Sequence, residues 1–196
     1  GYIVPSAGGG STARANVAAF ERWRIVPRML IDHAARDLST EVLGVRMPAP
    51  VLLGPVGVQK LAHPEGELAS ARAASALGLT FVQSTQASHS IEEVAEASGD
   101  GSRWYQLYWP NDPELCESFL SRAKASGYTH LVLTLDTTLL GWRPRALDRG
   151  YLPFLGAEGI ATYTSDPVFT SRLEKPWQED PGAAGIQFAS VFPNPG

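Results

Sequence analysis

The sequence predicts an α/β fold in which parallel strands alternate with helices, as a sheet or a barrel. Short apolar segments recur roughly every 25 to 28 residues through the middle of the chain. Segments with helix caps and terminal glycines separate them, and polar side chains follow most of the apolar segments. Strands that are joined through helices in this way are typical of parallel βαβ units.

A glycine-rich arm and a helix are predicted first, in residues 1–50, which we interpret as an N-terminal arm and cap. We expect Ser11 and Thr12 to cap the helix and Pro27 to end it. Its apolar positions recur at helical spacing, at Val17, Phe20 and Trp23. The helix is therefore expected to cover one end of a larger body.

Between Thr40 and Met47, residues that alternate around Gly44 predict a short hairpin, and four β/α units follow in residues 51–149. The predicted strands are Val51–Leu53, Thr80–Val82, Trp104–Tyr108 and Leu131–Leu135. The predicted helices run from about Pro64 to Leu77, from the Ser90 cap onward and from about Pro113 to Ser126.

The C-terminal part, from about residue 150 to residue 196, holds many Pro and Gly residues and no sustained periodicity. Its aromatic residues are scattered: Tyr151, Phe154, Tyr163, Phe169 and Trp177. A connection of this length is unusual unless it is disordered or acts as a lid. We predict a lid loop after the fourth strand, and we treat residues 1–196 as a single, incomplete domain.

Composition excludes several classes of function. A formal charge of −4, from 16 basic and 20 acidic residues, provides no basic stripe for nucleic acid. Cys116 is the only cysteine, so we expect no disulfide framework and no metal site built on thiols. No apolar run approaches the ~18 residues of a membrane span, and the N-terminus lacks a signal pattern. These features indicate a soluble, cytoplasmic protein.

Polar side chains stand at the carboxyl ends of the third and fourth strands, in pairs two residues apart. Gln106 and Tyr108 form one pair, and Thr134 and Asp136 form the other. Because side chains alternate along a strand, both members of a pair face the same side. The carboxyl ends of parallel strands share one rim, so these side chains are expected to lie close together.

The other strand ends add to this rim. Gly54 to Gly57 offer bare backbone, and Ser84 and Thr85 offer hydroxyls. A polar, uncharged cradle beside exposed backbone suits a flat heteroaromatic ring. Further along, Gly141 allows a turn, and Arg143 places a fixed charge that can bind a carboxylate or phosphate at two points.

Each candidate also has a purely structural interpretation. The alternatives are a strand-end turn for Thr134 and Asp136, a solvated charge for Arg143, an exposed side chain for Tyr2, backbone satisfaction for Gln106, a turn residue for Ser84 and backbone geometry for Gly57. Cys116 is expected to be a buried, small apolar residue. His130 stands at the start of a strand, and we interpret it as structural.

Several motifs recur in a fixed order from residue 1 to about residue 150. They are Gly1-Tyr-Ile with Ala7-Gly-Gly, Pro27-Arg-Met-Leu, Gly54-Pro-Val-Gly57, Gln106-Leu-Tyr108, Thr134-Leu-Asp136 and Gly141-Trp-Arg143. Together they resemble the FMN-dependent 2-hydroxy-acid oxidase family, and within it the lactate oxidases and lactate 2-monooxygenases. The resemblance implies a TIM (β/α)8 barrel that assembles as a homotetramer. This chain would supply the first four β/α units, the N-terminal helical arm and the long loop after strand four.

The resemblance also implies FMN as the cofactor and a role for six residues in binding it. The backbone of three consecutive residues would lie against the flavin near N5: Pro55, Val56 and Gly57. Three side chains would form hydrogen bonds with the edge of the flavin ring: Ser84, Gln106 and Thr134.

For the substrate, the resemblance implies that Tyr2, Tyr108 and Arg143 bind the carboxylate and carbonyl end. Asp136 would orient the family's catalytic histidine. Tyr108, Asp136 and Arg143 are therefore the predicted catalytic residues. A charge-assisted clamp of this kind fixes the α-hydrogen of the substrate toward the flavin.

The implied activity is the FMN-dependent oxidation of a small L-2-hydroxy acid by oxygen, and the crowded carboxylate site favours L-lactate. A lactate oxidase gives pyruvate and hydrogen peroxide, whereas a lactate 2-monooxygenase gives acetate, carbon dioxide and water. A long lid favours the monooxygenase because it traps the product beside peroxide. Gly57 favours it as well, since many oxidases of this family carry alanine there and leave less room over the flavin.

The family's catalytic histidine belongs to the second half of the barrel, and none of the four histidines of this chain has the expected position. Loss of a general base costs on the order of 10²- to 10⁴-fold in rate. We therefore expect this chain to need a C-terminal half or a second polypeptide. Two alternatives stay open: a non-catalytic half-barrel that assembles with a partner, and a dehydrogenase that passes electrons to another carrier.

Overall fold

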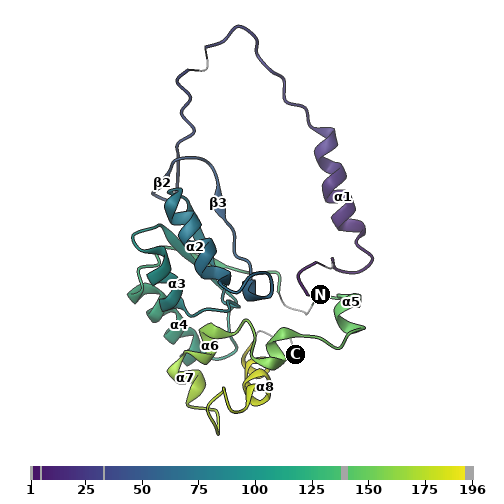
Figure 1. The fold of residues 1–196 in the computed structure, drawn as a ribbon, viewed down its shortest axis with the longest axis vertical. Coiled ribbons are helices and arrows are strands. Elements are labelled where there is room, and N and C mark those ends of the chain that lie inside the picture. The colour runs from purple at the N-terminus through teal and green to yellow at the C-terminus, as the bar shows by residue number, and fades with distance from the viewer. Residues whose placement is uncertain (1, 5, 33, 138–140, 193–196) are drawn as a thin grey trace.

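The structure is a computed structural model that describes residues 2–4, 6–32, 34–137 and 141–192 (Figure 1). The strands are β1 (Thr40–Val42), β2 (Val45–Met47), β3 (Leu52–Leu53), β4 (Thr80–Gln83), β5 (Arg103–Leu107) and β6 (Leu131–Leu133). The α-helices are α1 (Ser11–Ala19), α2 (Gly66–Ala76), α3 (Ile91–Ser98), α4 (Pro113–Ala125), α5 (Pro144–Leu147), α6 (Ala161–Thr164), α7 (Pro167–Thr170) and α8 (Pro181–Val191). The 3₁₀-helices are η1 (Phe20–Arg22), η2 (Gln59–Leu61) and η3 (Pro153–Gly156). Among the described residues, no helix combines the length and the apolar character that a membrane crossing requires.

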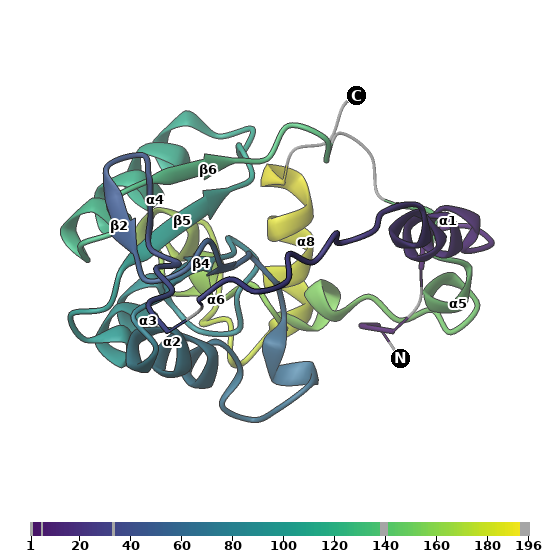
Figure 2. The same cartoon turned by 90° about the horizontal axis from the view of Figure 1, so that it is seen from above.

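Four parallel strands form the main sheet in the order β3-β4-β5-β6 (Figure 2). The strands follow the sheet in chain order, and α2, α3 and α4 connect them, so the predicted β/α alternation is confirmed. Strands β3 and β6 stand at the two edges of this sheet. Leu131 and Leu133 of β6 remain 46% and 41% exposed, so the outer strand is covered on one side only.

Capping residues set the starts of the helices between strands. Ser90 accepts a hydrogen bond from the Glu93 N–H at 3.1 Å, and the Glu93 carboxylate accepts one from the Ser90 N–H at 2.8 Å. This reciprocal capping box confirms the predicted start of α3. The Asp112 side chain caps α4 by accepting from the Leu115 N–H at 3.0 Å. Helix α2 begins at Gly66, which has a positive φ of 44°, slightly later than the predicted start at about Pro64.

The N-terminal segment departs from the expectation raised by its sequence. The hairpin of β1 and β2 is confirmed, and His130 bonds the Leu43 carbonyl with its Nε2 at 3.0 Å, which supports its structural role. Helix α1, however, is capped by Gly10 in a left-handed conformation without a side-chain hydrogen bond, so the predicted Ser11-Thr12 cap is wrong. The helix ends at Ala19, well before Pro27.

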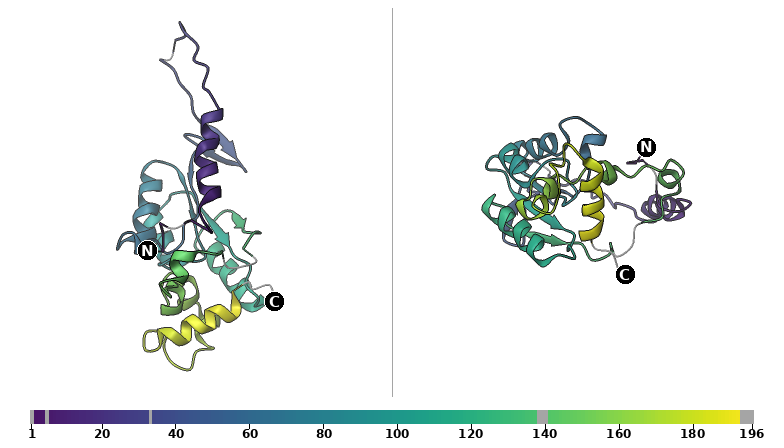
Figure 3. Two further views of the ribbon diagram at one scale, coloured as in Figure 1. Left: turned by 90° about the vertical axis from the view of Figure 1, so that its right-hand side faces the viewer. Right: turned by 90° about the horizontal axis from the view of Figure 1, so that it is seen from below.

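Helix α1 covers no body of the protein, which corrects the second expectation for this segment. None of its residues is buried, and it stands apart from the sheet (Figures 1 and 3). The apolar side chains of α1 and of the turn after it are exposed, from 72% at Val17 to 80% at Phe20 and Trp23. The apolar spacing of this helix therefore produces no buried face, although Val17 and Ala18 line a pocket together with Trp142.

The C-terminal segment, residues 150–192, forms the short helices η3, α6, α7 and α8, which its sequence pattern does not indicate. Four of its aromatic residues are at most 5% exposed: Phe154, Tyr163, Phe169 and Phe188. They join one apolar core with residues of β5 and α4. The ring of Tyr163 lies edge-on to the ring of Phe119 of α4, with 4.9 Å between the ring centres.

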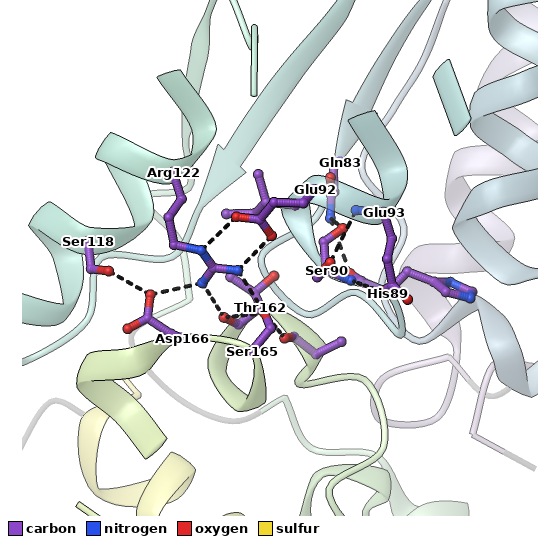
Figure 4. Close-up of polar contacts among 12 residues, drawn as sticks. Gln83, His89, Ser90, Glu92, Glu93, Ser118, Arg122, Thr162, Ser165 and Asp166 are labelled. Carbon is purple, nitrogen blue, oxygen red and sulfur yellow. Dashed lines mark hydrogen bonds and ion pairs between the residues drawn. The ribbon is translucent and has the colours of Figure 1, made fainter. Parts of the chain in front are cut away.

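Arg122 of α4 ties this segment to the sheet units (Figure 4). Its guanidinium donates two hydrogen bonds of 2.8 Å to Glu92 of α3, one of 2.8 Å to Asp166 and one of 2.9 Å to the Thr162 carbonyl. Asp166 is fully buried and also accepts from Ser118 at 2.7 Å. Burying these charges is costly, and the hydrogen bonds that satisfy both the guanidinium and the Asp166 carboxylate offset that desolvation cost.

Candidate functional site

The site begins with a row of hydrogen bonds across three adjacent strand ends. The Ser84 hydroxyl donates to the Gln106 carbonyl oxygen Oε1 at 3.1 Å, and Gln106 Nε2 donates to the Thr134 hydroxyl at 2.7 Å. Ser84 and Gln106 are buried, at 3% and 2% exposed. The structure therefore brings together the three side chains that the sequence predicts at one rim.

Thr85 fixes this row; the sequence places it at the rim beside Ser84 but predicts no role for it. Its N–H donates to Gln106 Oε1 at 3.1 Å, so the amide oxygen faces two donors and the amide nitrogen must point toward Thr134. Its hydroxyl donates to the Gln106 backbone carbonyl at 2.5 Å and accepts from the Tyr108 N–H at 3.1 Å. Only its position beside Ser84 hinted at this function.

The backbone of the β3–α2 loop lies next to this row. A Cβ atom on Gly57 would meet the Gln86 carbonyl oxygen at 3.0 Å and the Ser84 hydroxyl at 3.6 Å. The methyl group of an alanine would therefore press on the neighbouring loop. Close packing against the Gln86 backbone is thus a second, structural reason for a glycine at position 57. Pro55 and Val56 precede it, and Val56 is 57% exposed, so this part of the loop is open to a ligand.

A second cluster holds the residues predicted for the substrate. The Arg143 guanidinium lies over the Tyr2 ring, 4.9 Å from its centre. Burial raises the pKa of Tyr108, so its phenol remains a proton donor at neutral pH. The Asp136 side chain is exposed and accepts from the Thr137 hydroxyl at 3.4 Å.

Tyr2 and Arg143 line a small pocket of about 240 Å³. The other residues that line it are mainly apolar: Gly141, Ala146, Leu147, Gly150, Tyr151, Leu152 and Leu155. A fixed charge beside an apolar wall suits a small organic anion with a short side chain. Two of the three residues predicted for substrate binding, Tyr2 and Arg143, thus meet at the start of the C-terminal segment, whereas Tyr108 does not line this pocket.

The histidines lie elsewhere. His130 contacts the hairpin, as described above, and His63 accepts the Glu65 N–H at 3.2 Å. His89 is buried against Glu67. His33 lies outside the described residues. Within the described ranges, no group of three His, Cys, Asp or Glu side chains is placed to hold a metal ion.

The residues present fit the flavin ring that the sequence resemblance implies. The row at the ends of β4, β5 and β6 presents hydroxyl and amide groups, Gly57 lies next to its Ser84 end, and Val56 of the same loop is exposed. The row carries no formal charge, which suits the edge of a flavin ring, where hydrogen-bond donors and acceptors alternate. Cys116 is buried, as expected, and burial raises the pKa of its thiol.

Known proteins resemble this chain over nearly all of its length. A family model described as FMN-dependent dehydrogenase matches residues 1–190. An FMN-dependent alpha-hydroxy acid dehydrogenase of Schizosaccharomyces pombe is 42% identical, over 98% of this chain and 50% of its own length. An L-lactate oxidase of Lysinibacillus sphaericus is 40% identical, over 88% of this chain and 45% of its own length.

Solved structures agree with these sequence relatives. A mandelate oxidase superposes with a TM-score of 0.72 at 35% identity, over 77% of this chain and 43% of its own. A mutant of an active chimera of (S)-mandelate dehydrogenase gives 0.73 at 38% identity, over 77% and 42%. This chain spans about half the length of the relatives it matches. The predicted fold class, an α/β barrel to which this chain contributes four β/α units, is confirmed.

Proposed function

This chain belongs to the family of FMN-dependent dehydrogenases, and we propose that it provides the flavin edge and the carboxylate clamp of a 2-hydroxy-acid oxidoreductase. The observation that carries this proposal is the row Ser84–Gln106–Thr134 at three adjacent strand ends. Its side chains are uncharged, nearly all buried and held by one another, so they are organised before a ligand arrives. The bound FMN would accept the two electrons and the hydrogen that leave the substrate carbon.

The proposed substrate is a small L-2-hydroxy acid, with L-lactate as the first choice. Arg143 supplies the positive charge for the carboxylate, and Tyr2 lies against that charge. Tyr108 stays protonated because burial raises its pKa, so it can donate to the same end of the substrate. Asp136 is exposed in this chain, which leaves it free to orient a histidine from the remainder of the protein.

Oxygen is the proposed acceptor, with monooxygenation to acetate, carbon dioxide and water ahead of release of pyruvate and hydrogen peroxide. The support is the C-terminal segment, which packs beside Tyr108: the rings of Tyr108 and Phe192 lie 5.4 Å apart. A packed lid would slow the escape of product. We also propose that a C-terminal half or a partner chain completes the barrel. The assembled protein would be a homotetramer in the cytoplasm.

The test is a titration of the purified chain with FMN, followed by flavin fluorescence, and then anaerobic addition of L-lactate. We expect saturable binding that weakens about tenfold or more in Gln106→Leu, because two buried partners lose their hydrogen bonds. Gln178→Leu is the matched surface control. Absence of binding would favour the non-catalytic half-barrel.

Lactate should bleach the bound flavin only when the remainder of the barrel is present, because the general base is expected there. Aryl hydroxy acids should bleach it more slowly if the proposed substrate size is correct. Bleaching followed by slow reaction with oxygen would favour a dehydrogenase with another electron acceptor.

A further inference from the structure

A strained residue directly follows Gly57 in the β3–α2 loop. Val58 adopts the left-handed conformation, with φ 54° and ψ 41°, which β-branched residues rarely do. It is also 2% exposed, so solvent cannot relax it. Strain of this kind persists only where the surroundings hold the backbone in place, and it is common at functional sites.

Contacts on three sides hold this turn. The Val58 N–H donates to the Gln86 carbonyl at 2.9 Å. The next N–H, of Gln59, donates to the Glu67 carboxylate at 3.1 Å. On the third side lies Gly159 of the C-terminal segment, where a Cβ atom would stand 2.5 Å from Val58 Cγ2.

Glu67 links this turn to the neighbouring loop. Its side chain is fully buried, and Oε1 accepts a second hydrogen bond, from the Ser88 N–H at 3.0 Å. Its other oxygen, Oε2, lies 3.0 Å from Nδ1 of His89. A buried carboxylate is tolerated only when its oxygens are satisfied. Here the partners come from two different loops, the one that carries Gly57 and the one that carries Ser84.

We propose that Glu67 is a positioning residue that holds the β3–α2 and β4–α3 loops in register. It acts through Gln59 and Ser88, and it thereby fixes the backbone of Gly57 against the Ser84 end of the polar row. The inference rests on the proposed function in one respect, since Gly57 and Ser84 are taken there as flavin contacts. The link between the two loops is independent of any ligand.

Amide hydrogen exchange of the whole chain tests the link without flavin. The Gln59 and Ser88 amides should be protected in the wild type, although both lie in loops. In Glu67→Leu both amides should exchange about tenfold faster or more, which is the usual range for hydrogen bonds to a charged group. Glu67→Gln should stay close to the wild type because its amide oxygen can accept the same two bonds. The control Glu65→Gln removes an exposed carboxylate at the start of the same helix.

If Glu67→Leu does not fold, Glu67→Asp tests the same link, because it keeps the charge and shortens the reach. Equal exchange at Gln59 and Ser88 in the wild type and in the variant that folds would overturn the inference. The second readout is the dissociation constant for FMN, which should rise about tenfold in Glu67→Leu and stay unchanged in Glu65→Gln.

The two readouts separate the inference from the proposed function. Normal FMN binding by Glu67→Leu, with its loop amides exposed, would contradict the positioning role alone. A wild-type chain that binds no FMN would contradict the proposed function and the role of Glu67 toward the flavin. The exchange data would then still decide whether Glu67 links the two loops.

Discussion

Residues 11–38 and residues 150–192 are both rich in large apolar side chains, but only the second segment buries them. Phe20 and Trp23 are 80% exposed, whereas Tyr163 and Phe169 are fully buried. The first segment includes the nine-residue helix α1, in which no residue is buried. The second consists of short helical turns whose aromatic rings meet edge to face over α4.

The difference shows that regular periodicity and burial are separate properties. An isolated helix of this length is marginal in water, so its apolar spacing contributes little without a packing partner. The C-terminal segment has such a partner, because Arg122 anchors its polar backbone and Phe188 joins its rings to the core. Hydrogen-bonded anchors and aromatic contacts hold an irregular segment that periodicity does not identify.

The largest effect on this difference is expected from removing the contact between Arg122 and Asp166, which anchors the C-terminal segment. Asp166→Ala leaves the Arg122 guanidinium without its buried partner and should lower the free energy of unfolding by about 3 to 5 kcal/mol. Urea unfolding followed by circular dichroism measures this change. Arg172→Ala, which removes a more exposed ion pair, should cost at most about 1 kcal/mol. Similar losses in the two variants would show that the buried pair is not an anchor.

Truncation of one aromatic ring in each segment compares their burial directly. Phe188→Ala should cost about 3 kcal/mol because it leaves a cavity beside Tyr163 and Phe154. Phe20→Ala should change the free energy of unfolding by less than about 0.5 kcal/mol. Urea unfolding of both variants decides the point. A large loss in Phe20→Ala would indicate that α1 packs against the protein in solution.

The pH dependence of stability should reflect the apolar core in which Tyr163 of the C-terminal segment meets Tyr105 and Tyr128. Burial raises the pKa of Tyr105, Tyr128 and Tyr163 above the ordinary value of 10.0. The folded chain thus keeps these phenols neutral, so their stabilising contribution is present below pH 10 and is lost as the pH rises through the folded pKa values. Between pH 10, where the unfolded chain ionises, and the raised folded pKa, we expect each tyrosine to lower the free energy of unfolding by about 1.4 kcal/mol per pH unit. Constant stability in urea unfolding from pH 9 to pH 11 would contradict their burial.

Helix caps provide the smallest test. Ser90→Ala should cost about 1 kcal/mol, because it removes the capping box of α3. Ser11→Ala should have almost no effect, since the Ser11 side chain makes no capping bond at α1. Thermal unfolding of both variants measures the difference. Equal decreases in the unfolding temperature of the two variants would show that Ser11 caps α1, as the sequence predicts.

Most of the β/α units and much of the candidate site could be predicted from the sequence. The helix start at Ser90 follows from local hydrogen bonding, and the rim of Ser84, Gln106 and Thr134 follows from the alternation of side chains along parallel strands. Such signals are local or repeat with a fixed period, so they are visible without the fold.

Tertiary structure alone decided the rest. Thr85 and Glu67 act by joining segments that are distant in the sequence, and neither has a motif of its own. The burial of residues 150–192 depends on Arg122, which reaches them from another helix. The sequence by itself determined which elements form and which side chains share a rim, because those depend on neighbouring residues. Which segments pack, and what holds the rim in place, depended on long-range contacts that no local pattern records.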